Sequence, residues 1–368
     1  MSIRFEKDSG KATNGPMFFF SILRDETFME EIRNAFISGL SFYAYRFPGD
    51  SMLAFGSSEG FIEGIGSPGF LIGMFNPDLP YITIPYSEGK RHPEIDSLYE
   101  MPGRSTTREE YASEVDQIIR DLKGKRDAKV VAARVIVRNT DFDIAEKFYE
   151  LCQKYPDAFV FCFGTPATGC WLGVSPELLL SSTNNQISTM ALAGTRSKKT
   201  AASLSDQNQG LNTDHPWDLK NIEEQEIVAN YILEKFRQQG LTAIAYPTFT
   251  KEAGKVEHIC TPISATLPDE VSDKLIADLL RTLSPTPALC GHPKEFALQE
   301  IRSLEKFNRG CYGGFCGPYH SPQDFSLNVV IRCAAVSQKN YAIYVGGGIT
   351  SRSEVDSEWQ ETESKIPF

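Results

Sequence analysis

Short apolar runs separated by Gly, Pro, Asp and Ser fill the first hundred residues. FYAYRF, MLAFGS, FLIGMF and YITIPY are such runs. Each has the length and composition of a β-strand, and the residues between them are typical of turns and loops. Residues 1–104 are therefore predicted to be strand-rich, and they carry no motif that can be placed.

A helical pattern begins at residue 107. Thr107 and Glu110 have the spacing of a capping box, and apolar residues then recur on one helix face until Gly124. The next apolar run, KVVAARVIVRN, is predicted to be a buried strand that begins at Lys129.

Runs of strands and helices occupy the remainder of the chain. Strands are predicted at 158–165, 170–175, 177–182, 186–194, 311–319, 324–336 and 341–348. Helices are predicted near 142–154, 217–239, 269–283 and 293–305, and again over the last residues. Because the strands follow one another in hairpin-like order without strict alternation with helices, the pattern favours an α+β fold with antiparallel sheet over a Rossmann-like α/β fold.

Charge and composition limit the partners and the location of the protein. The net charge of −11 disfavours a nucleic-acid surface, and an anionic ligand would need a locally positive or metal-bearing pocket. The N-terminal MSIRFEKDSGKATNG lacks the apolar core of a signal peptide, and no run of about 20 apolar residues could span a membrane. We therefore expect a cytoplasmic protein. The eight scattered cysteines are expected to be reduced core thiols, and a zinc site at Cys311, Cys316 and His320 is disfavoured.

The C-terminal segment SEWQETESK places charges at helical spacing. Glu358, Glu361 and Lys365 stand three and four residues apart, so a helix would align two carboxylates and an ammonium group, and two preceding serines could cap it. Taken alone, these charges are explained most simply by a solvated helix face. The GGG triplet before them favours a site instead, because glycines let the backbone approach a ligand closely.

Three other charged residues fall where burial is expected. Glu224 lies within the apolar stripe of the 217–239 helix, so it requires either an ion-pair partner or a metal ion. Lys129 shares a strand face with apolar residues, and it either reaches solvent from the strand end or acts as a general base with a lowered pKa. Glu177 follows Pro176 at a turn, and it is either a surface residue or an acid whose pKa partial burial raises.

Nine segments of the chain occur in the order typical of the chorismate-utilising, anthranilate synthase component I-like enzymes, and the chain resembles the isochorismate synthases most. The segments are KVVAARV, GVSPELLL, ALAGTRSKK, LKNIEEQEIV, SPTPALCGHP, YGGFCG, VVIRCA, GGGIT and EWQETESK. They make residues 105–368 the expected chorismate-binding catalytic region. The resemblance implies a single large domain over residues 1–368, with large, mostly antiparallel sheets and flanking helices.

The resemblance also implies a role for individual residues. Lys129 corresponds to the base that activates water for attack at C2 of chorismate, and Glu177 to the acid that protonates the departing C4 hydroxyl. Glu224 and Glu361 correspond to ligands of Mg²⁺, with Glu358 as a ligand through water. The implied substrate-binding residues are Ala193, Gly194, Thr195, Ala288, Leu289, Tyr312, Arg332, Gly346, Gly347, Gly348 and Lys365.

Three functions are compatible with this pattern. A lysine at position 129 is typical of the water-using enzymes that the chain resembles, so we expect isochorismate synthase activity without a glutaminase subunit. We also expect a monomer. Salicylate synthases share that lysine, but Ala288 and Leu289 resemble the isochorismate synthases. A catalytically dead chorismate-binding or interaction protein is disfavoured because the acid, base and metal positions are all filled. Two positions depart from the family pattern, since Ser284 and Gln225 both replace a histidine.

Overall fold

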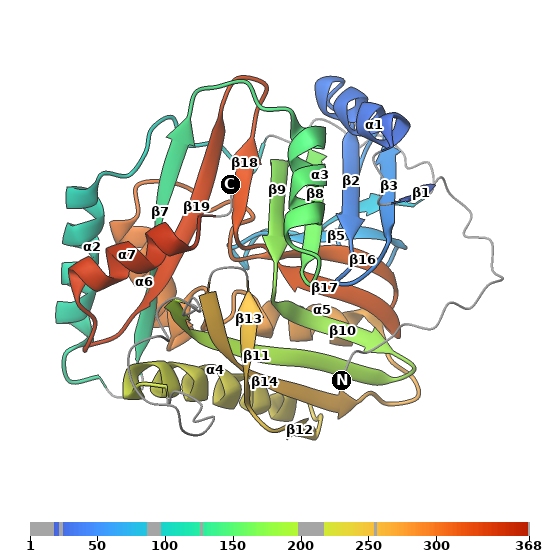
Figure 1. The fold of residues 1–368 in the computed structure, drawn as a ribbon. Coiled ribbons are helices and arrows are strands. Elements are labelled where there is room, and N and C mark those ends of the chain that lie inside the picture. Colours follow the sequence, from blue (N-terminus) through green and yellow to red (C-terminus); the bar gives the residue numbers. More distant parts are fainter. Residues whose placement is uncertain are drawn as a thin grey trace, which may run out of the picture.

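Two antiparallel sheets pack against each other in the computed structural model, which describes residues 18–21, 25–86, 97–125, 128–197, 217–253 and 256–366 (Figure 1). Within these residues the first sheet has nine strands, in the order β1 (Phe18–Ser21), β3 (Met52–Ser58), β2 (Ser41–Arg46), β8 (Phe159–Thr165), β9 (Gly169–Ser175), β18 (Cys333–Val336), β19 (Tyr341–Ile349), β7 (Lys129–Arg138) and β15 (Gly291–His292). The second sheet follows the order β12 (Ala243–Ala245), β14 (Val256–Thr266), β11 (Gln186–Ser197), β10 (Leu178–Thr183), β17 (Asp324–Val329), β16 (Phe315–Ser321), β5 (Gly69–Gly73), β6 (Ile82–Pro85) and β4 (Ile62–Glu63), and β13 (Phe249–Ala253) also pairs with β14.

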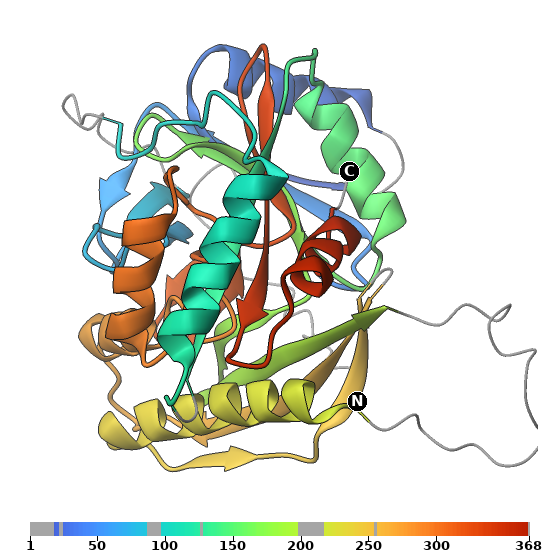
Figure 2. The ribbon, with the colours of Figure 1, turned by 90° about the vertical axis from the view of Figure 1, so that its left-hand side faces the viewer.

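Seven helices flank the sheets in the described part of the chain. They are α1 (Glu26–Ile37), α2 (Arg108–Leu122), α3 (Ile144–Lys154), α4 (Leu219–Gln238), α5 (Asp273–Leu283), α6 (Lys294–Leu304) and α7 (Val355–Ser364). Helices α1 and α3 cover the outer face of the first sheet, while α2, α6 and α7 lie side by side near β7 (Figure 2). Helix α4 packs on β11 and β14 of the second sheet.

The central strands are apolar on both faces because each face packs on a different layer. In β2, Tyr43 and Tyr45 point into the core between the sheets, whereas Phe42 and Ala44 pack against α1 and α3. Successive side chains of a strand point to opposite faces, so a strand covered on both sides appears in the sequence as a continuous apolar run. The expected α+β fold with large antiparallel sheets and flanking helices is confirmed.

The first 104 residues contribute to both sheets. Strands β1, β2 and β3 belong to the first sheet, and β4, β5 and β6 belong to the second. The prediction of strands and loops alone was incomplete, because the segment also forms α1, which begins at the N-cap Asp25. The N-terminal residues 1–17, on which the signal-peptide argument rested, lie outside the described residues.

The structure differs from the predicted elements at four other points. The run 324–336 is not one strand: β17 ends at Val329 in the second sheet and β18 begins at Cys333 in the first. Strands β12, β13 and β14, between two predicted helices, were not foreseen, and the strand predicted at 311–319 begins only at Phe315. Helix α7 has Glu354 as its N-cap and no side-chain cap; Ser353 Oγ accepts a hydrogen bond from the Thr350 amide instead.

The cysteines and the helices bear on two further expectations. All eight cysteines are free thiols, and Cys170 alone among them is not fully buried in the described structure. No helix among the described residues is both long and apolar enough to cross a membrane.

Candidate functional site

A cavity of about 70 Å³ lies where the two sheets, α4 and the end of α7 meet. It is lined by residues from β7, β11, β14 and β19 and from α4. Residues of the segment 330–332, which crosses from β17 in the second sheet to β18 in the first, also line it. The predicted site residues that border it are Glu177, Ala193, Gly194, Glu224, Ala288, Leu289, Tyr312, Arg332, Gly346, Gly348 and Lys365. Segments far apart in the sequence therefore converge on one cavity.

Four predicted residues lie beside the cavity without lining it, and the side chain of a fifth is not described. Lys129, Gly347, Glu358 and Glu361 are neighbours of the lining residues Glu224, Gly348 and Lys365. Thr195 belongs to β11, but its side chain is outside the described part of the structure.

Lys129 and Glu224 form a buried ion pair at the inner end of the cavity. Lys129 is fully buried at the start of β7, and its Nζ donates to Glu224 Oε1 at 2.5 Å. Glu224 projects from the second turn of α4, which Asp218 caps. Because an unpaired charge is costly in the interior, each of these groups accounts for the burial of the other. The strand-end alternative for Lys129, in which the ammonium group reaches solvent, is therefore excluded.

Glu177 is buried and lines the same cavity. It follows the turn after β9, where its amide donates to Ser175 Oγ and its carbonyl oxygen accepts from the Val329 amide. Burial raises the pKa of the Glu177 carboxyl to about 8, although the nearby cations Lys251 and Lys129 lower it. The carboxyl can therefore hold a proton at neutral pH, as required of a general acid.

Arg332 occupies the segment that crosses from β17 to β18. Its backbone φ of 45° is a conformation that residues other than glycine rarely adopt, and it lets the chain pass from one sheet to the other. The Arg332 Nη2 donates to His258 Nε2 at 2.9 Å, so His258 Nδ1 carries the proton and donates to the Gly194 carbonyl oxygen at 3.1 Å. Burial and the neighbouring Arg332 charge hold the pKa of His258 well below its usual range. A neutral histidine thus orients a buried guanidinium at the cavity wall.

Of the three glycines at the end of β19, Gly347 and Gly348 pack directly against charged side chains and Gly346 packs against a tyrosine. A Cβ on Gly348 would lie 2.5 Å from Glu224 Oε1 and 3.0 Å from Lys129 Nζ. A Cβ on Gly346 would lie 2.8 Å from the Tyr312 hydroxyl. Since real Cβ atoms essentially never come within 3.0 Å of another atom, a side chain at Gly346 or Gly348 would force Tyr312, Glu224 or Lys129 to move.

Lys365 is fixed by two contacts at the end of α7. Its Nζ donates to the Gly346 carbonyl oxygen at 3.0 Å and to Glu361 Oε1 at 2.8 Å. The predicted alignment of Glu361 and Lys365 on one helix face is confirmed. The ammonium group borders the cavity, where it can face an anion.

The residues near Gly347 fit a hard cation in their chemistry. Glu358 Oε2 and Glu361 Oε1 both lie within 3.5 Å of the position that a Cβ on Gly347 would take, so the glycine leaves space between carboxylates. The hydroxyl of Tyr111, fully buried and without a hydrogen bond in the described structure, lies 3.8 Å from the same position. Carboxylate and hydroxyl oxygens are ligands that suit Mg²⁺ and its bound waters.

In this conformation, however, lysines hold two of the three proposed metal ligands. Glu224 pairs with Lys129, and Glu361 pairs with Lys365. Among the described residues, no three acidic, histidine or cysteine side chains are gathered closely enough to hold a metal ion as they stand. The side chains suit the cation, but these two ion pairs would have to open before it binds.

The small size of the cavity also indicates that the site must open before it binds a ligand. Its volume of about 70 Å³ is well below the roughly 300 Å³ of typical small-molecule sites. A ring-sized ligand would enter only if the lining side chains separated. Opening the ion pairs at Glu224 and Glu361 would free both carboxylates.

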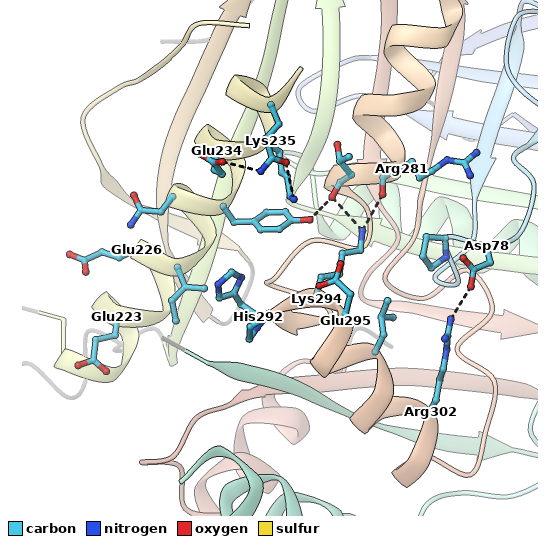
Figure 3. Close-up of a pocket in the computed structure, with 18 residues that line it drawn as sticks. Asp78, Glu223, Glu226, Glu234, Lys235, Arg281, His292, Lys294, Glu295 and Arg302 are labelled. Carbon is cyan, nitrogen blue, oxygen red and sulfur yellow. Dashed lines mark hydrogen bonds and ion pairs between the residues drawn. The ribbon is translucent and has the colours of Figure 1, made fainter. Parts of the chain in front are cut away.

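A larger hollow of about 920 Å³ shares no lining residue with this cavity (Figure 3). It lies between α4 and the start of α6, and several of its charged groups already have partners. Lys294 Nζ donates to the Ser284 and Thr282 carbonyl oxygens that follow and end α5, and burial lowers its pKa to about 8. Arg302 pairs with Asp78 at 3.1 Å. We therefore assign the chemistry to the smaller cavity, where the sequence motifs meet.

Several residues at the site were not anticipated from the sequence. The cavity is also lined by Val131, Leu192, His258, Ile331, Tyr344 and Val345. Of these, His258 carried a signal, since it is a lone histidine in the apolar run VEHICTP. Lys251, next to Glu177, comes from a strand that was not predicted.

Gln225, which departs from the family pattern, binds the backbone of β11 next to the site. Its Oε1 accepts a hydrogen bond from the Ala193 amide at 2.8 Å, and its Nε2 donates to the Ala191 carbonyl oxygen at 3.0 Å. The side chain therefore joins α4 to β11 beside Glu224.

Solved structures share this fold over nearly the whole chain. Over 96% of this chain and 93% of the other, it superimposes with a TM-score of 0.72 and 18% identity on MenF, the menaquinone-specific isochorismate synthase from Escherichia coli. The anthranilate synthase component I from Streptococcus pneumoniae gives a TM-score of 0.61 at 17% identity, over 99% of this chain and 95% of that one. At such identities the likeness concerns the fold.

Sequence comparison relates the chain to isochorismate synthases. It is 30% identical over 262 residues to isochorismate synthase 2, chloroplastic, of Arabidopsis thaliana, covering 70% of this chain and 45% of that protein. It is 29% identical over 271 residues to the vibriobactin-specific isochorismate synthase of Vibrio cholerae, covering 71% of this chain and 66% of the relative. The chain thus spans about half to two thirds of the length of these relatives. Residues 85–367 match the chorismate binding enzyme family, and the chain belongs to that family.

Proposed function

We propose that the protein is a Mg²⁺-dependent isochorismate synthase, an isomerase that adds water at C2 of chorismate and removes the C4 hydroxyl. The observation that carries the proposal is that buried Glu177 lines one cavity with Arg332 and Lys365, while buried Lys129 lies directly beside it, paired with the lining residue Glu224. The named relatives are isochorismate synthases, which supports this reaction among those of the family.

The acid and the base would act at two ends of the rearranging double-bond system. Glu177, whose pKa of about 8 keeps it protonated at neutral pH, donates its proton to the departing C4 hydroxyl, which leaves as water. Lys129 accepts a proton from the water that forms the new bond at C2. Overall one water enters and one leaves, so the reaction is an isomerisation. Before it can accept a proton, Lys129 must exchange its contact with Glu224.

The carboxylates of the substrate would meet the cations of the site. Arg332 at the crossing segment and Lys365 at the end of α7 border the cavity and supply positive charge in a protein whose net charge is −11. Mg²⁺, held by Glu224 and Glu361 with Glu358 beside them, would supply further positive charge for a substrate carboxylate when bound.

Product analysis with purified protein tests the proposal. With chorismate, Mg²⁺ and no ammonia source, we expect isochorismate as the main product on chromatography. Lys129→Ala and Glu177→Gln should each lower the rate by about 10²–10⁴. Salicylate and pyruvate as main products would establish salicylate synthase activity instead. Chorismate binding without turnover would indicate a catalytically dead chorismate-binding protein instead.

A further inference from the structure

Lys251 reaches the site from an exposed part of the molecule. It lies in β13, opposite His258 in the ladder with β14, on a strand whose neighbours Phe249 and Thr250 are exposed. Its side chain nevertheless turns inward across β11, where its Nζ lies 3.6 Å from Met190 Sδ. A lysine on an exposed strand normally keeps its ammonium group in water. The inward direction of Lys251 therefore requires a specific partner for its charge.

That partner is the turn that carries Glu177. Lys251 Nζ donates to the Pro176 carbonyl oxygen at 2.6 Å, one residue before Glu177. Proline has no amide hydrogen, so Pro176 can be held from its carbonyl side but cannot donate to a neighbouring strand. The other contacts of this turn, the Ser175 hydroxyl and the Val329 amide, bind Glu177 itself. Lys251, which belongs to the second sheet, adds a third contact that holds this turn in place.

The charges around this contact have a clear arrangement. The charges of Lys251 and Glu177 act on each other; Cys260 and Arg332 also act on Lys251, and Lys129 also acts on Glu177. The other titratable residues bordering the cavity are Glu224, His258, Tyr312, Arg332, Tyr344 and Lys365. Of the two cations acting on Glu177, Lys251 has the larger effect.

We propose that Lys251 is a positioning residue for Glu177: its ammonium group binds the Pro176 carbonyl oxygen and holds the acid at the cavity rim. This inference rests on the proposed function. Lys251 does not line the cavity, so it acts through Glu177 and not on the substrate. Its charge also keeps the pKa of Glu177 lower than burial alone would set it, which makes the acid easier to deprotonate.

The test compares Lys251→Met with Lys251→Arg in steady-state kinetics on chorismate from pH 6 to 10. Lys251→Met should lower kcat by about 10–100-fold with KM changed less than about threefold, because the acid is misplaced while the groups that bind substrate remain. The alkaline limb of the kcat profile, where Glu177 loses its proton, should move to higher pH because a cation is gone. Lys251→Arg keeps charge and donor, and it should restore the limb and most of kcat.

The control is Lys274→Met, which removes an exposed lysine of α5 that pairs with Asp278 and should leave both readouts at wild-type values. A lysine that only stabilises the fold would lower the melting temperature without moving the alkaline limb, and that result overturns the inference. A rise in KM at unchanged kcat also overturns it, since Lys251 would then bind substrate.

A folding failure does not prevent the test. Should Lys251→Met not fold, Lys251→Gln keeps a polar head without the charge, and an unmoved alkaline limb in that variant contradicts the inference. Wild-type protein without isomerase activity refutes the proposed function and this inference with it. Wild-type turnover with an unmoved limb in the variants refutes the role of Lys251 alone.

Discussion

Replacing Glu177 with glutamine should make the protein more stable and less active, and the gain in stability should depend on pH. Glu177 is 3% exposed, and burial raises its pKa to about 8. A carboxyl whose pKa is higher in the folded than in the unfolded protein binds more protons when folded, so the free energy of unfolding falls as pH rises. Glutamine has nearly the same shape and cannot ionise.

The magnitude follows from the two pKa values. An unfolded glutamate has a pKa of about 4.3, and one pKa unit corresponds to about 1.4 kcal/mol. At pH 7 the folded carboxyl is still mostly protonated, whereas the pH lies about 2.7 units above the pKa of the unfolded one, so the raised pKa destabilises the wild type by about 3.6 kcal/mol. At pH 5 the same difference is about 1 kcal/mol. The stability advantage of Glu177→Gln over the wild type should therefore grow by about 2.5 kcal/mol between pH 5 and pH 7.

Urea unfolding at pH 5, 6, 7 and 8, followed by circular dichroism, measures this gain. The relevant quantity is the variant minus wild-type free energy of unfolding, because titrations common to both proteins cancel in it. Glu30→Gln, at an exposed position of α1, measures the effect of removing a surface glutamate. A Glu177→Gln difference that stays constant from pH 5 to pH 8 would refute the assignment of a raised pKa, and with it the protonated acid.

Further predictions concern the glycines, the guanidinium and the metal. Gly348→Ala should lower activity by at least about 100-fold, since its Cβ would lie 2.5 Å from Glu224 Oε1; Gly103→Ala, with nothing within 4 Å, is the matched control, and equal rates for both would contradict this packing. Arg332→Gln should raise KM for chorismate by about tenfold or more, and an unchanged KM would remove the residue from substrate binding. Chelation should abolish turnover and added Mg²⁺ restore it, with full activity in chelator arguing against a metal.

The hydrophobic pattern alone determined much of the fold. Apolar runs covered on both faces, such as β2 and β8, were predicted as strands because their composition and length leave few alternatives. The capping box at Thr107 marked the start of α2 correctly. The burial of Glu224 followed from helical periodicity, because its position lies within an apolar stripe.

The partners of the charged residues depended on tertiary structure. Lys129 and Glu224 are 95 residues apart in the chain, and the sequence left open whether an ion pair or a metal satisfies Glu224. Similarly, the sequence could place Lys251 neither in a strand nor beside Glu177, because its strand has an exposed, weakly patterned sequence. Periodicity reports which face of an element is buried, but the residue it meets depends on how distant segments pack.

The clearest example is the run from Asp324 to Val336. In the sequence it looks like one strand, because both halves are apolar and no glycine or proline separates them. In the fold it crosses from one sheet to the other at Arg332, where a positive φ makes the turn and brings the guanidinium to the cavity. Local preferences disfavour that conformation in a non-glycine residue, so only the packing of two sheets at one cavity accounts for it.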